Sequence, residues 1–74
     1  MSKYAVVYEA PDKPDGNWGA YDPDLPGLGV VGDTFEECRE NMVTGIVAHV
    51  AALRARGFEV PAPTTRVEEV LVAA

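Results

Sequence analysis

The pattern of hydrophobic and polar positions divides the chain into short strands followed by one long helix. Residues 3–9 and 17–21 are rich in aromatic and β-branched side chains, and a run of turn formers at 10–16 separates them. This arrangement predicts a β-hairpin. Residues 22–27 contain two prolines and a glycine, so the second strand must end there and the chain reverse. A third strand is predicted at residues 29–32.

A helix is predicted over residues 34–56. Thr34, followed three positions later by Glu37, forms a capping box, and acidic side chains at this end suit the helix dipole. Gly57 can take the left-handed conformation that ends a helix, and Pro61 lies beyond it. The helix would be amphipathic and about six turns long. Its apolar positions recur every three or four residues, at Phe35, Cys38, Met42, Ile46, Val50 and Leu53.

The closing segment, residues 65–72, is compatible with either a strand or a short helix. Val67, Val70 and Leu71 have helical spacing, but the β-branched content favours a strand, which we expect. If this strand pairs in parallel with the first, the helix is the crossover between them. The expected fold is therefore α+β, in the order β-β-β-α-β. One long helix would pack on a four-stranded mixed sheet, in a single domain spanning residues 1–74.

Composition indicates a small folded protein. The hydrophobic fraction of 47% and the charged fraction of 24% are ordinary for a globular chain. One cysteine rules out an internal disulfide, and neither a signal-peptide pattern nor a membrane-spanning apolar run is present. We expect a cytoplasmic protein. A domain of 74 residues has little stability to spare, so a homo-oligomer, either a dimer or a tetramer, is also expected.

The charge balance disfavours direct contact with nucleic acid. Twelve acidic residues stand against six basic ones, for a net charge of -6, whereas binding to a phosphate backbone requires lysine and arginine. A basic protein partner fits this charge. An acidic composition also serves solubility alone, and the sequence does not choose between the two interpretations.

The residues able to carry chemistry do not form a recognisable site. The only histidine, His49, and the only cysteine, Cys38, lie about three helical turns apart and cannot form a local dyad. Asp22 and Asp24 flank a proline and lack the spacing of a calcium loop, so they are expected to cap backbone groups in a solvated turn. We therefore expect no enzymatic activity, cofactor or metal.

Binding surfaces are the stronger signal, because one helix covers only one face of a sheet. Apolar side chains on the other face would mark an interface. Periodicity leaves open whether Trp18 or Tyr21, and Tyr4 or Tyr8, point outward. Glu68 and Glu69 on the last strand would either attract a partner or discourage aggregation. The candidate partner-binding residues are Trp18, Tyr21, Asp22, Asp24, Glu68 and Glu69.

Two motifs resemble the core signature of the HicB-like antitoxin family, W-x-A-x-x-P-D-L-P-G and G-D-T-x-E-E. In this chain they read Trp18, Ala20 and residues 23–27, then residues 32–34 with Glu36 and Glu37. The similarity continues through the helix to residues 61–63. Family members commonly have a cysteine after the first motif, where this chain has Leu28. Many also continue into a C-terminal DNA-binding domain, which we do not expect in this chain.

The resemblance implies a truncated ribonuclease-H-like fold and a function in binding. The family's partner is HicA, a small basic mRNA-cleaving toxin with a catalytic histidine, and this chain would neutralise it by covering its active site. The alternative is a stand-alone homo-oligomeric adaptor without a toxin. An enzyme that depends on His49 or on the turn at Asp22 and Asp24 ranks last. Whether operator DNA is bound through another chain stays open.

Overall fold

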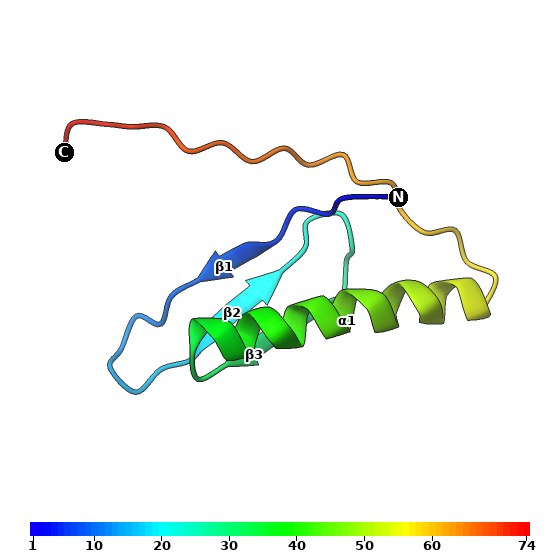
Figure 1. Cartoon of the computed structure of the whole chain (residues 1–74), viewed down its shortest axis with the longest axis horizontal. Coiled ribbons are helices and arrows are strands. Elements are labelled where there is room, and N and C mark those ends of the chain that lie inside the picture. Colours follow the sequence, from blue (N-terminus) through cyan, green and yellow to red (C-terminus); the bar gives the residue numbers. More distant parts are fainter.

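The computed structural model describes all 74 residues and contains three strands and one helix (Figure 1). The strands are β1 (Val7–Glu9), β2 (Trp18–Tyr21) and β3 (Gly29–Gly32). They form one antiparallel sheet in the order β1-β2-β3. The register places Ala20 opposite both Tyr8 and Val30, so these three residues share the face that the helix covers. The predicted hairpin and third strand are confirmed, but the first strand is confined to residues 7–9 instead of the predicted 3–9.

The helix α1 (Phe35–Ala55) packs on β2 and β3 (Figure 1). Thr34 is its N-cap, and the Thr34 Oγ1 accepts a hydrogen bond from the Glu37 amide at 3.1 Å. The Glu37 carboxylate accepts from the amide of Asp33 rather than from that of Thr34. At the other end, the amide of Phe58 donates to the Leu53 carbonyl and Gly57 has a φ of 73°, which is a Schellman ending. Both predicted helix ends are confirmed.

The core of the protein is small. Only six of the 74 residues are buried, and the central cluster consists of Ala20, Cys38 and Met42. Leu25, in the turn between β2 and β3, is fully buried as well. Six half-buried side chains pack around the central cluster, namely Val6, Tyr8, Trp18, Leu28, Val30 and Ile46. Since so few side chains are completely enclosed, the stability of the fold depends on close packing at a few contacts.

The tightest of these contacts joins β3 to the first turns of α1. A Cβ atom on Gly32 would lie 2.5 Å from the Cys38 backbone nitrogen and 2.8 Å from its Cα. Farther along, a Cβ built on Gly45 would lie 3.3 Å from Leu28 Cδ1. Glycine at position 32 therefore allows the backbones of strand and helix to approach each other. The Asn41 side chain reinforces this contact by donating to the Val31 carbonyl at 2.9 Å.

The expected four-stranded mixed sheet is wrong, because residues 65–72 form neither a strand nor a helix. The observed fold is βββα with three antiparallel strands, so the α+β class holds but the parallel strand and the crossover do not. The ribonuclease-H-like arrangement expected from the resemblance lacks that strand too. The physical reason is that residues 66–74 make no backbone hydrogen bond, although they are extended and run past β1 (Figure 1).

The second half of α1 extends beyond the sheet, where it faces the N-terminus of the chain (Figure 1). An open groove of about 810 Å³ lies there, lined by Met1, Ser2 and Tyr4, by the second half of α1 and by residues 60–63. Val47, on this part of the helix, is largely exposed. No helix of the protein combines the length and the apolar character that a membrane crossing requires.

Replacing Gly32 with alanine is expected to destabilise the fold by about 1–3 kcal/mol, because the new methyl group would push the helix off the sheet. Gly19 provides a matched control, since a Cβ atom there meets nothing within 4 Å. Gly19→Ala should change the free energy of unfolding by less than about 0.5 kcal/mol. Urea denaturation followed by circular dichroism measures both values. Equal effects of the two substitutions would contradict the close contact at Gly32.

Candidate protein-binding surfaces

Three aromatic side chains meet where α1 begins. The Phe35 ring lies 4.9 Å from the ring of Tyr8 and 5.2 Å from that of Trp18, centroid to centroid, and both pairs are tilted toward an edge-to-face arrangement. Pairs of this geometry contribute about 0.5–1.5 kcal/mol each beyond the area they bury. All three side chains are only half-buried. The cluster therefore stabilises the helix start and also presents aromatic surface to solvent.

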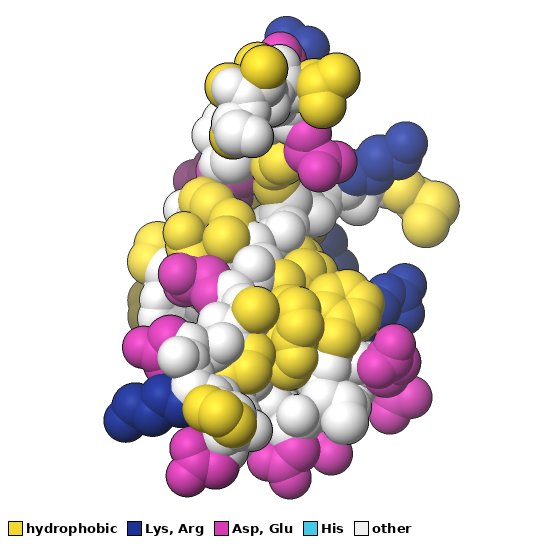
Figure 2. Space-filling view, turned by 90° about the vertical axis from the view of Figure 1, so that its left-hand side faces the viewer, with side chains coloured by type: hydrophobic (Ala, Val, Ile, Leu, Met, Phe, Trp, Pro, Cys, Tyr) yellow, Lys and Arg dark blue, Asp and Glu magenta, His cyan; other side chains and the backbone are white.

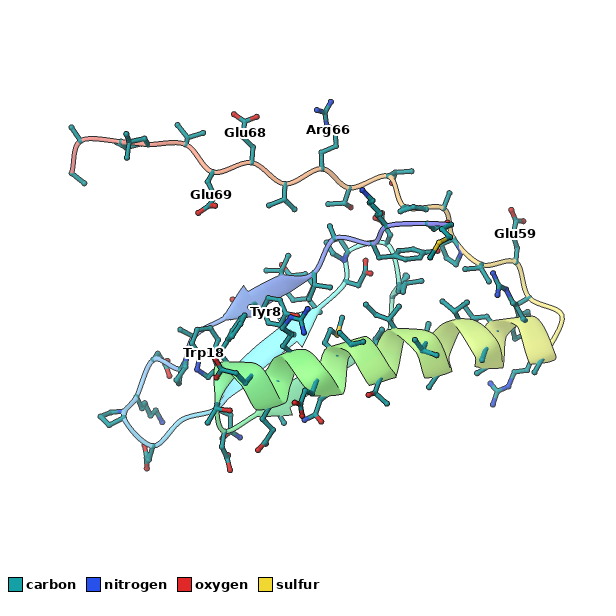
Figure 3. All side chains as sticks on the ribbon, viewed as in Figure 1. Tyr8, Trp18, Glu59, Arg66, Glu68 and Glu69 are labelled. Carbon is teal, nitrogen blue, oxygen red and sulfur yellow. The ribbon has the colours of Figure 1, made fainter.

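Acidic side chains surround this aromatic cluster. Figure 2 views the molecule from this end and shows a patch of hydrophobic side chains with acidic side chains beside and below it, and with fewer Lys or Arg side chains at its margin. Figure 3 shows Tyr8 and Trp18 beside the first turn of α1. We call this surface the aromatic end, defined by the Tyr8, Trp18 and Phe35 cluster and by the exposed carboxylates that adjoin it in sequence, Glu9, Asp33, Glu36 and Glu37.

The sheet face opposite the helix carries a second apolar surface. Strand alternation places Tyr21 and Val31 on it, and they are 44% and 61% exposed. Val7 lies opposite Tyr21 across β1 and β2 and is half-buried. The sequence left open which aromatic residues point outward. The structure places Tyr21 on the uncovered face, and Trp18 and Tyr8 on the helix side.

Asp22 belongs to the interior of the turn between β2 and β3. Its side chain is 3% exposed, and its Oδ1 accepts the Asp24 amide at 2.8 Å. Its Oδ2 has no hydrogen-bond partner among the atoms of the protein. The Asp22 carbonyl accepts the amide of Leu25, which is buried beneath the turn. The Asp22 carboxylate thus shapes the turn and is not presented to solvent.

Asp24 holds the C-terminal segment against this turn. Its Oδ2 accepts the Thr64 and Thr65 amides at 3.2 and 3.0 Å, and its Oδ1 accepts both threonine hydroxyls at 3.0 Å. The Thr65 amide is the main cause that lowers the pKa of the Asp24 carboxyl from its ordinary value. Desolvation, the second largest cause, raises this pKa, and the remaining threonine bonds each lower it. A second tie joins the Tyr4 hydroxyl to the Pro61 carbonyl at 2.6 Å.

Beyond this attachment, residues 66–74 form an exposed extended segment, which we call the C-terminal arm. Glu68 and Glu69 point to opposite sides of it, as expected for extended chain (Figure 3). Neither makes a hydrogen bond or an ion pair within the protein. The arm also exposes large hydrophobic side chains that have no cover, namely Val67, Val70, Leu71 and Val72.

The two residues weighed for catalysis lie apart and in different surroundings. Cys38 is completely buried at the sheet, whereas His49 is half-buried on the second half of α1. No three side chains among histidine, cysteine, aspartate and glutamate are grouped so that they could hold a metal ion. The sequence did not identify Thr64 and Thr65 as partners of Asp24. Two adjacent threonines after a proline were the only local sign, and their acceptor lies 40 residues away from Thr64.

Replacing Asp24 with alanine is expected to release Thr64 and Thr65 from the turn. Four hydrogen bonds end on this carboxylate, so amide hydrogen exchange at both threonines should become much faster. Asp15→Ala is the control, because Asp15 is an exposed turn carboxylate with no such bonds. Unchanged exchange at Thr64 and Thr65 in Asp24→Ala would contradict the attachment.

The same attachment should depend on pH with a defined sign. Because the pKa of Asp24 is lowered in the folded protein, its bonds add stability above the ordinary aspartate pKa and lose it as pH falls through the lowered value. The NMR amide shifts of Thr64 and Thr65 report this titration. Their common midpoint should lie below the ordinary aspartate range. A midpoint at or above that range would show that the carboxylate does not accept these bonds.

Comparison of the chain with protein-family models, with curated proteins and with solved structures found no match. The resemblance to HicB-like antitoxins therefore stays a prediction that depends on the two sequence motifs. The aromatic end, the uncovered sheet face and the C-terminal arm are the structural basis on which a function can be proposed.

Proposed function

We propose that this protein is a binding module of the HicB-like antitoxin type, which neutralises a small, basic, mRNA-cleaving toxin of the HicA type in the cytoplasm. The observation that carries the proposal is the aromatic end, where half-buried aromatic rings are surrounded by carboxylates. This combination suits a basic protein partner. The whole molecule is also acidic, with a net charge of -6, so its long-range field attracts the same kind of partner.

The physical argument assigns different tasks to the rings and to the carboxylates. Aromatic side chains are the residues that most often dominate binding energy, because they bury a large area at a small entropic cost. Trp18 and Tyr8 are already held in place by Phe35. Carboxylates at the rim accelerate encounter with a positively charged partner and contribute less to the final affinity.

Neutralisation on this basis is steric and electrostatic. A toxin that cleaves mRNA binds its substrate through a basic surface, and an acidic protein bound there excludes the RNA. Of the candidate residues, Trp18, Tyr21, Glu68 and Glu69 have exposed or half-exposed side chains and are retained as contacts. Asp22 and Asp24 have internal partners, so their contribution is to shape the turn and hold the arm.

The experiment uses the small basic protein that the proposal expects to be encoded beside this chain. The two purified proteins are mixed, their association is measured by calorimetry, and cleavage of an mRNA by the basic protein is followed with and without this chain. We expect a tight complex and suppressed cleavage. If the neighbouring protein binds but still cleaves RNA, or does not bind, the antitoxin function is wrong.

Charge reversal distinguishes the aromatic end from the rest of the surface. Glu36→Lys should weaken toxin binding by about three- to tenfold, mainly through slower association, and the difference should shrink at high salt. Glu59→Lys is the matched control, because Glu59 is also exposed but lies beyond the other end of α1 (Figure 3). A lysine at a helix start lowers the stability of the protein by roughly 0.3–1 kcal/mol, and thermal melting of both variants measures this separate effect. Equal effects of both substitutions would exclude the aromatic end as the binding surface.

A further inference from the structure

We propose that the C-terminal arm of one copy of this chain adds as a strand to the free edge of β1 in a second copy, and that the second copy's arm does the same in return. The product is a dimer with two-fold symmetry. This inference does not rest on toxin binding, because it is argued from the unpaired backbone groups of β1 and of the arm. Side chains of both elements, Tyr8 in β1 and Glu68 and Glu69 in the arm, also belong to the surfaces proposed for the toxin.

The arm has the properties of a strand without a partner. Residues 66–74 are extended and exposed, and their backbone groups make no hydrogen bond to any part of the protein. The β-branched and leucine side chains at 67, 70, 71 and 72 favour a sheet over solvent. Leu71 is fully exposed and Val70 is 73% exposed. In an isolated chain this apolar surface stays in water and contributes no hydrophobic stabilisation. Six residues of such a strand span about 20 Å.

β1 is the edge that can accept this strand. It lies at one side of the three-stranded sheet, and the helix packs mainly on β2 and β3, with the contact between Phe35 and Tyr8 reaching β1. The opposite edge, β3, is already partly occupied, since Asn41 donates to the Val31 carbonyl there. An open edge strand presents unpaired amide and carbonyl groups, which are the groups that strand addition satisfies.

The way the arm is attached favours a second copy of the chain as the partner of the free β1 edge. Asp24 and Tyr4 hold residues 61–65 beside the start of β1, and the arm runs past β1 from there without bonding to it (Figure 1). Every copy therefore has one unpaired arm and one open edge. Reciprocal exchange between two copies satisfies both at once and closes the assembly, because no free arm or β1 edge is left to recruit a third.

The test is the mass in solution of the protein comprising residues 1–74, measured by light scattering coupled to size exclusion. The wild type should have twice the chain mass of 7.9 kDa. Val70→Pro and Leu71→Pro are then compared. Successive residues in a strand direct their amides to opposite sides, so only one of these prolines removes a hydrogen bond to β1.

The proline that removes a hydrogen bond to β1 should weaken the dimer at least about tenfold more than the other proline does, because each dimer contains that hydrogen bond twice. Helix content by circular dichroism should be unchanged in both variants, because the arm lies outside the core. A monomeric wild type would overturn the proposal. So would a dimer that both prolines weaken equally, or that neither weakens, because strand pairing requires the difference between adjacent positions.

Discussion

The structure depends on the close approach of α1 to β3. Gly32 has no side chain, and the backbone of Cys38 occupies the space that a Cβ atom would take. This contact brings Cys38 and Met42 against Ala20, and these three residues are the buried cluster of the protein. The aromatic cluster at Phe35 depends on the same contact, because Phe35, the first residue of the helix, must lie within reach of the Trp18 and Tyr8 rings. In a domain with so few buried residues, losing this approach would affect both the fold and the surface it presents.

The sequence predicted the elements that local chemistry determines. The turn after β2 requires prolines and a glycine, and the start of α1 requires a threonine with a glutamate three residues later, so both were identified correctly. Residues 65–72 were assigned wrongly because a strand also needs a backbone partner. A local pattern of β-branched residues says that a segment prefers extended conformation. It does not say which edge, or which chain, the segment will meet.

The sequence predicted the binding surfaces only in part. Tyr21 and Trp18 lie three residues apart in one strand and so point to opposite faces, but which face is covered became clear only when the helix was placed. The carboxylates of Asp22 and Asp24 were correctly expected to bond to backbone groups, but as part of a solvated turn. Asp22 is instead buried, and the threonine partners of Asp24 come from a distant part of the chain. No spacing rule connects residues so far apart in sequence.

The molecule has one well-packed part and one part with unpaired backbone groups. The helix packs on β2 and β3, whereas the C-terminal arm and the free edge of β1 have unpaired backbone groups. Hydrogen exchange of the isolated protein at high and low concentration tests this division most directly. Protection of α1 and β2 should be independent of concentration, while protection of residues 67–72 should appear only at high concentration. Protection of the arm that persists unchanged on dilution would show that the arm pairs within its own chain, and would contradict strand exchange between two copies.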